Sequence, residues 1–134
     1  MPTGYLDANG DPCITIEVSN PLNWKISLDC LIDTGFTGFL SIPILQAFPI
    51  GLLLITTVPV TMADGRTDPK LGCLGRVHLG PESQVGLIII EPSSTKPVLG
   101  MDFLKKFNKR LIVDPLQNIV ELTDSIIVHP PSTI

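Results

Sequence analysis

Hydrophobic and polar residues alternate along much of the chain, in short runs separated by turn-forming residues. The alternation is regular over residues 13–19 and 24–33, with only the sequence NPLN between them, and it predicts a β-hairpin. Residues 53–62 and 72–80 predict a second pair of strands. They are joined through ADGR at 63–66, whose Asp-Gly pair is typical of a tight type I′ hairpin turn.

The segment 84–91 differs from these strands because almost all of its residues are apolar. A strand of this kind is usually covered on both faces, so we expect it to be central in a sheet. A polar loop at 92–97 and a short apolar segment at 98–100 follow. Near the end of the chain, 111–115 and 118–122 predict a last hairpin.

One α-helix is predicted over residues 100–110. Phe103, Leu104 and Phe107 follow helical spacing. Asp102 lies near the positive end of this helix and the basic residues lie near its negative end, as the helix dipole prefers. Asp102 is therefore interpreted as a helix-start residue.

Residues 41–60 carry no charge, which raises the question of a membrane span. Several prolines and a glycine interrupt the segment, and no basic residues flank it. We expect instead a helical turn at 43–48, ended by Pro49 and Gly51, and then a buried strand. No membrane partner is expected.

The length of 134 residues fits one domain, so residues 1–134 are expected to form a single unit. Its core is expected over about 12–123, with 124–134 as a tail or as a strand used in dimerisation; SIIVH at 125–129 is the candidate for that strand. The composition is 44% hydrophobic and only 16% charged, which indicates a rich core or an apolar surface that a partner covers.

Net charge and cysteine content indicate which partners and which cellular compartment to expect. The net charge of −4 makes a nucleic-acid partner improbable. Cys13, Cys30 and Cys73 are odd in number and have no CxxC spacing, so neither a disulfide framework nor a zinc site is expected. The N-terminus lacks the pattern of a signal peptide. We expect a reducing, cytoplasmic location.

The candidate catalytic residue lies in LIDTGFTGFLSIP at 31–43, where Asp33 stands between an apolar run and a glycine-containing turn. A lone acid at a strand end usually caps a turn. Here the apolar approach should drive Asp33 inward, Thr34 supplies a hydroxyl beside it, and Gly35 removes side-chain bulk. A second apolar segment with a glycine turn, KPVLGMDFLKKF, begins at Lys96 and suggests a weak internal symmetry.

These blocks resemble those of retropepsin-type aspartic proteases, close to the small single-lobe enzymes of prokaryotes. The resemblance depends on 31–43, on VTMADGRT at 60–67 and on VLGMDFLKKF at 98–107, in this order. It implies an all-β fold with one short α-helix in the C-terminal half, forming the closed β-barrel lobe of acid proteases. It also implies an aspartic endopeptidase.

The resemblance further implies a homodimer that acts on a peptide or protein substrate. The family needs two facing aspartates, whereas this chain has one Asp-Thr-Gly block. Asp33 of each subunit would form the catalytic pair. Thr34 would bond across the dimer, and Gly35 would let the substrate backbone lie close. No metal ion and no cofactor is implied.

The block at 60–67 is similar to the flap hairpin that closes over the substrate in this family. It is equally well interpreted as an ordinary turn when taken alone. The flap residues that the resemblance implies are Met62, Ala63, Asp64, Gly65 and Arg66.

The chain departs from the retroviral pattern at three positions. Phe36 and Thr37 stand where retroviral members often have Ala and Asp, and Met101 stands where they often have Arg. That Asp and Arg form a pair in the retroviral enzymes, so this dimer must be held differently, for which the apolar termini are candidates. Phe36 and Phe39 are candidates either for pocket lining or for the core.

Two other functions remain open from the sequence. The first is a catalytically silent member of the same fold that binds peptides or only dimerises. The second is an unrelated β-rich domain that binds a partner.

Overall fold

The computed structural model describes residues 3–20, 22–51, 56–61 and 63–126. The strands of the first half are β1 (Tyr5–Leu6), β2 (Pro12–Ser19), β3 (Lys25–Ile32), β4 (Leu40–Pro43) and β5 (Thr56–Thr61). The later strands are β6 (Thr67–Leu79), β7 (Glu82–Glu91), β8 (Val98–Leu99), β9 (Lys109–Asp114) and β10 (Ile119–Asp124). The helices are α1 (Ile44–Ile50) and α2 (Met101–Lys106).

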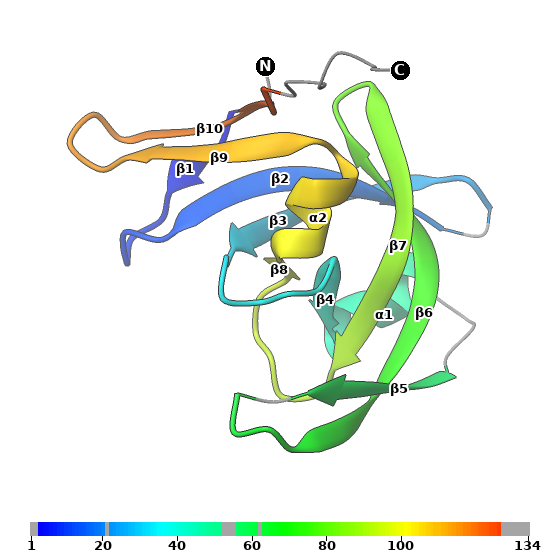
Figure 1. Ribbon diagram of the computed structural model, residues 1–134. Coiled ribbons are helices and arrows are strands. Elements are labelled where there is room, and N and C mark those ends of the chain that lie inside the picture. Colours follow the sequence, from blue (N-terminus) through cyan, green and yellow to red (C-terminus); the bar gives the residue numbers. More distant parts are fainter. Residues whose placement is uncertain (1–2, 21, 52–55, 62, 127–134) are drawn as a thin grey trace, which may run out of the picture.

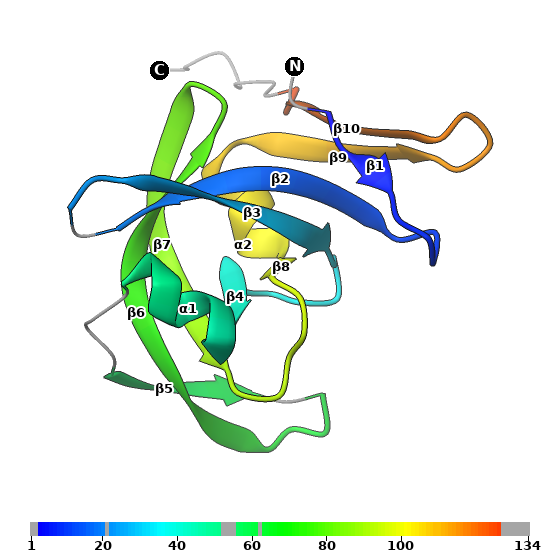
Figure 2. The same ribbon diagram turned by 180° about the vertical axis from the view of Figure 1, so that it is seen from behind.

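Eight of these strands form one mixed sheet in the order β1-β2-β3-β8-β4-β7-β6-β5. β2 also pairs with β6, with Glu17 opposite His78 and Ser19 opposite Arg76. This extra pairing makes a closed ring of strands in the order β2, β3, β8, β4, β7 and β6. Figures 1 and 2 show the ring from opposite sides, with β6 and β7 as long, curved ribbons.

The core lies within the ring and includes alternate side chains of its strands. Ile14, Ile16 and Val18 of β2 are almost completely buried. An aromatic cluster of Phe39 and two residues of the α2 region, Phe103 and Phe107, extends the core. The ring centroids of Phe103 and Phe107 are 4.7 Å apart, and those of Phe39 and Phe103 are 5.9 Å apart. Aromatic packing therefore fixes α2 against the chain just before β4.

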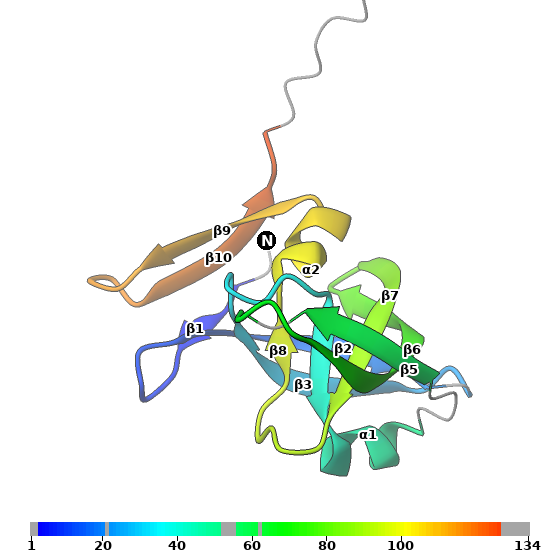
Figure 3. The ribbon, with the colours of Figure 1, turned by 60° about the horizontal axis from the view of Figure 1, so that its bottom comes forward.

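β9 and β10 form a separate two-stranded sheet that projects from the ring (Figure 3). The buried side chain of Lys109 attaches this hairpin to β7. Its Nζ lies 2.7 Å from Oε2 of Glu82 and 2.5 Å from Oδ1 of Asp124. Val120 and Leu122 of β10 are also buried in the core, and the N–H of Gly4 donates to the carbonyl of Val120 at 2.8 Å. The hairpin is thus held to the rest of the chain by this buried cation together with apolar packing and a backbone hydrogen bond.

The structure confirms the all-β prediction with a short helix in the C-terminal half. The β2–β3 hairpin and the β9–β10 hairpin lie where the sequence predicted them. β7 is central, between β4 and β6, and Ile88, Ile89 and Ile90 are buried. The candidate terminal strand at 125–129 is not seen at Ser125 and Ile126, and 127–129 lie outside the described residues.

Both helices differ from their predicted bounds. α1 includes Pro49, so the prediction that Pro49 ends it is wrong. A proline in the last turn of so short a helix removes only one helical hydrogen bond, and the helix ends at Gly51, whose φ of 76° is left-handed. α2 ends at Lys106 because Asn108 adopts a left-handed φ of 56° and Lys109 begins β9.

The β5–β6 hairpin also differs from prediction. β6 begins at Thr67 and pairs with β5 from Thr61 onward, so the connection spans 62–66 and is not a two-residue type I′ turn. Gly65 has a positive φ of 88°, but Asp64 does not have a positive φ. β5 is the last strand of the sheet, and Thr57, Pro59 and Thr61 are exposed, so the expectation of a buried strand is wrong for these residues.

Three short strands, β1, β4 and β8, were not predicted as strands, although β8 lies in the apolar segment 98–100. The uncharged stretch 41–60 is divided among β4, α1 and β5. No helix within the described ranges has the length and apolar character that crossing a bilayer requires.

Candidate active site

Asp33 is the first residue after β3 and begins the loop 33–39, which leads to β4. β8 lies between these two strands, parallel to β3 and antiparallel to β4. The backbone N–H of Asp33 donates to the carbonyl oxygen of Leu99 in β8, at 2.9 Å. The two segments with weak internal symmetry therefore lie side by side, and the second one fixes the backbone of the acid.

The Asp33 carboxylate is held within its own loop. Its Oδ1 accepts a hydrogen bond from the N–H of Gly35 at 2.8 Å. A Cβ on Gly35 would lie only 3.1 Å from that oxygen, so a glycine suits the position. Asp33, Thr34 and Gly35 are all exposed, which makes the expectation of an inward-driven acid wrong for the single chain. The loop presents the carboxylate to solvent.

The start of α2 holds the rest of this loop. The N–H of Met101 donates to the carbonyl of Phe36 at 2.8 Å, and the N–H of Asp102 donates to that of Gly38 at 3.1 Å. These amides belong to the first turn of a helix, where N–H groups have no partner within the helix. Asp102 lies in that turn, which confirms its interpretation as a helix-start residue.

The predicted flap residues lie at the turn of the β5–β6 hairpin. Ala63, Asp64, Gly65 and Arg66 are exposed, and Met62 lies outside the described residues. The N–H of Arg66 and its guanidinium both bind the Asp64 carboxylate and lower the pKa of that carboxyl. Figures 1 and 2 show this turn on the same side of the molecule as the loop between β3 and β4.

The two phenylalanines of the motif have different environments. Phe39 is 1% exposed and belongs to the core, so its candidate role in a pocket is not supported. Phe36 is half-buried, and its ring packs on Gly38 and Gly100. Neither this contact nor the hydrogen bond from Asp33 to Leu99 was predicted from the sequence. The weak similarity between 31–43 and the segment that begins at Lys96 was the one sequence feature that linked the two regions.

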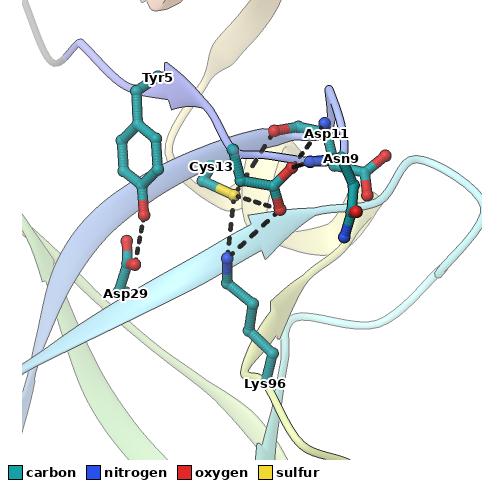
Figure 4. A network of polar contacts seen from close by, with 7 residues as sticks. Tyr5, Asn9, Asp11, Cys13, Asp29 and Lys96 are labelled. Carbon is teal, nitrogen blue, oxygen red and sulfur yellow. Dashed lines mark hydrogen bonds and ion pairs between the residues drawn. The ribbon is translucent and has the colours of Figure 1, made fainter.

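A polar network supports the other end of this region (Figure 4). Lys96 Nζ lies 3.2 Å from Sγ of Cys13 and 3.6 Å from Oδ2 of Asp7. Burial is the main cause that raises the pKa of the Cys13 thiol, and Lys96 opposes it. The next residue after Lys96, Pro97, accepts a hydrogen bond from the N–H of Leu31 at 2.9 Å. The network therefore stabilises the approach to β8.

A hollow of about 250 Å³ lies between the start of α1 and the loop after β7. It is lined by residues 43–46 and by Pro92, Ser94 and Thr95, and the Asp33 loop does not line it. In the part of the chain that the structure describes, no three His, Cys, Asp or Glu residues come together as metal ligands.

No protein-family model and no curated protein matches this chain. A retropepsin-like aspartic protease from Rickettsia conorii is similar in structure, with a TM-score of 0.61 and 15% identity over 88% of this chain and 86% of that one. The EIAV protease in complex with the inhibitor HBY-793 has a TM-score of 0.57 and 11% identity, over 80% of this chain and 97% of that one.

The retroviral protease-like domain of Ddi1 from Leishmania major is also similar, with a TM-score of 0.50 and 15% identity over 94% of this chain and 98% of that one. The chain therefore has a retropepsin-like fold.

Proposed function

We propose that this chain is an aspartic endopeptidase that acts as a homodimer, with Asp33 of each subunit in one catalytic pair. The observation that carries the proposal is the position of Asp33 in a retropepsin-like fold. The acid is exposed at the end of β3, while β8 and α2 hold its loop through backbone hydrogen bonds. Such an acid is fixed in position and still open to a partner subunit and a substrate.

The place of Asp102 supports the need for a second subunit. Asp102 lies in α2, and its N–H group helps to hold the loop of Asp33. It is therefore part of the support of one catalytic acid and is not proposed as the second. A symmetric dimer supplies the second carboxylate, because a two-fold axis brings the same residue of both copies together.

In the proposed reaction, two close carboxylates share one proton because both cannot easily be ionised. The ionised carboxylate takes a proton from a water molecule held between the pair, and the water oxygen attacks the peptide carbonyl carbon. The protonated carboxyl donates its proton to the carbonyl oxygen. The first acid then donates its new proton to the leaving nitrogen, and the carbon–nitrogen bond of the diol intermediate breaks. The second acid takes a proton from a diol hydroxyl, which restores the pair and leaves a carboxylic acid and an amine.

The other motif residues are proposed to position the dimer and the substrate. The exposed Thr34 hydroxyl would bond to the opposite loop, and Gly35 would leave room for the substrate backbone. The turn at 62–66 would close over an extended peptide and donate backbone hydrogen bonds. The reaction uses no metal ion or cofactor. The buried free thiols are consistent with the proposed cytoplasmic location.

The test is cleavage of a peptide library between pH 4 and pH 7 by the wild type and by Asp33→Asn. Asp11→Asn is the matched control, since it makes the same change at another exposed acid. Cleavage that is lost in Asp33→Asn and retained in Asp11→Asn supports the proposal. Cleavage by Asp33→Asn at the wild-type rate overturns it. A dimeric wild type that cleaves no peptide would instead support a silent peptide-binding protein.

A further inference from the structure

The ring of Phe36 occupies the space beside two glycines of the candidate active site. A Cβ built on Gly38 would lie 2.5 Å from Cζ of Phe36, and one built on Gly100 would lie 2.6 Å from its Cδ2. Both distances are shorter than real Cβ contacts allow. The ring can therefore lie where it does only because neither position carries a side chain.

Phe36 is also the only side chain that anchors the first part of the loop. Among residues 33–38, Asp33, Thr34, Gly35 and Thr37 are exposed, and Gly38 has no side chain. The half-buried ring of Phe36 is thus the sole side-chain packing between the buried residues Ile32 and Phe39.

The backbone of Phe36 joins the acid to α2. Its N–H donates to the carbonyl of Asp33 at 3.1 Å, and its own carbonyl accepts from the N–H of Met101 at 2.8 Å. Movement of the ring would therefore be transmitted to Asp33 through a turn that is closed by a direct hydrogen bond.

We propose that Phe36 is a positioning residue for Asp33. Its ring, packed on Gly38 and Gly100, holds the loop 33–39 in one conformation within a single subunit and so orients the carboxylate before any partner binds. The effect of this positioning on catalysis rests on the proposed function, whereas the packing of Phe36 on the two glycines does not.

The identity of Gly38 gives the proposal a specific test. The φ of Gly38 lies outside the left-handed region, so the backbone itself would accept an alanine. The three atoms nearest to the added methyl group, at 2.5 to 3.3 Å, all belong to the Phe36 ring. Gly38→Ala should therefore lower the melting temperature of the wild type, and the same change should cost little or nothing in a Phe36→Ala background.

Gly100→Ala is the matched control for this double-mutant cycle. A Cβ at Gly100 would also lie 2.4 Å from the carbonyl oxygens of Gly38 and Phe36, which remain when the ring is removed. The loss caused by Gly100→Ala should therefore persist in the Phe36→Ala background. If the losses from Phe36→Ala and Gly38→Ala are instead additive, the packing role is overturned.

Amide hydrogen exchange tests whether the contact reaches Asp33. Phe36→Ala should speed exchange at the amides of Asp33 and Phe36 at least tenfold, while the amides of Ile14 and Ile16 in β2 keep their protection. Phe36→Leu, which restores apolar bulk, should recover part of the protection. Unchanged exchange at Asp33 would overturn the proposal, and this result does not depend on activity.

Cleavage kinetics separate this proposal from the proposed function. If the wild type cleaves peptides, Phe36→Ala should lower kcat at least tenfold with a smaller change in KM, and Phe36→Leu should recover part of kcat. An equal kcat in Phe36→Ala would overturn the positioning role while leaving the proposed protease intact. If Asp33→Asn does not change cleavage, the proposed protease function is overturned. Hydrogen exchange and the double-mutant cycle would still decide whether Phe36 positions the loop.

Discussion

Asp33 combines an exposed side chain with a backbone that is fixed on both sides. Its N–H donates to Leu99 and its carbonyl accepts from Phe36, whereas among the described residues its carboxylate accepts one hydrogen bond, from the N–H of Gly35. Backbone hydrogen bonds of this kind do not depend on the charge of the side chain. A substitution that removes the charge of Asp33 should therefore leave its backbone in the same position.

This independence predicts the effect of Asp33→Asn on stability. In the proposed dimer the change removes repulsion between two close carboxylates, so the dimer should be as stable as the wild type or more stable at pH 7. The measurement is the melting temperature of both proteins at equal subunit concentration. An Asn variant that melts earlier and still cleaves peptides would show that Asp33 only caps a turn.

At the scale of elements, the attachment of the β9–β10 hairpin predicts a pH dependence. The Lys109 ammonium, hydrogen-bonded to Asp124, lowers the pKa of that carboxyl from its ordinary value of 3.8. A carboxyl with a lower pKa in the folded state stabilises the fold above its unfolded pKa, and this contribution is lost as the pH falls through the folded pKa. Asp124→Asn should therefore lower the melting temperature slightly at pH 7 and have no effect well below pH 3.8.

The control for this prediction is the same change in a Lys109→Gln background. Without the ammonium, the difference between pH 7 and low pH should disappear. Because the Asp124 side chain is 79% exposed, the effect should also shrink at high salt. A difference that survives in the Lys109→Gln background would assign the shift to another group.

The β5–β6 hairpin allows a test that separates strain from function. Gly65 and Gly80 lie just beyond opposite ends of β6, and both have positive φ. A Cβ at either would meet no atom of the described residues within 4 Å. Valine at either position is strained by the backbone alone, so both variants should lose a similar, modest amount of melting temperature. Gly65→Val should also lower peptide cleavage strongly, whereas Gly80→Val should not.

Equal cleavage by the two glycine variants would mean that the turn at 62–66 is an ordinary connection and not a flap. A much larger stability loss for Gly65→Val than for Gly80→Val would mean that the turn packs on the rest of the chain. Thermal unfolding and cleavage of one peptide substrate are sufficient for the comparison.

The sequence predicted those elements whose signal is local. Alternation found β2, β3, β9 and β10, and helical spacing found α2, because each pattern lies within a single segment. β4 was missed because its residues Leu40–Pro43 are all buried and show no alternation. β5 was taken as buried because its composition is apolar, yet its place at the sheet edge is set by pairing with distant strands.

The candidate site likewise has features that the local sequence predicted and features that depend on distant segments. The acid turn at Asp33 was recognisable from neighbouring residues, but the partners of its backbone come from a segment more than 60 residues later. The packing of Phe36 on Gly100 is likewise non-local. Such contacts depend on the closed order of the strands, which no single stretch of sequence contains.

At the scale of the whole molecule, the proposal predicts a homodimer in solution. One subunit presents one exposed Asp33, so the proposed chemistry is incomplete without a second copy. Sedimentation at increasing concentration should show a monomer–dimer equilibrium, and cleavage should rise with the fraction of dimer. A protein that stays monomeric at high micromolar concentration and still cleaves peptides would contradict the mechanism.

The placement of β8 between β3 and β4 also has a consequence for synthesis. During translation, the Asp33 turn leaves the ribosome long before Leu99 and Met101, which hold its backbone in the finished chain. A nascent chain that has not yet reached α2 therefore carries the acid but cannot order it. Any hydrolytic activity of Asp33 in the proposed dimer would therefore be delayed until that later segment has been made.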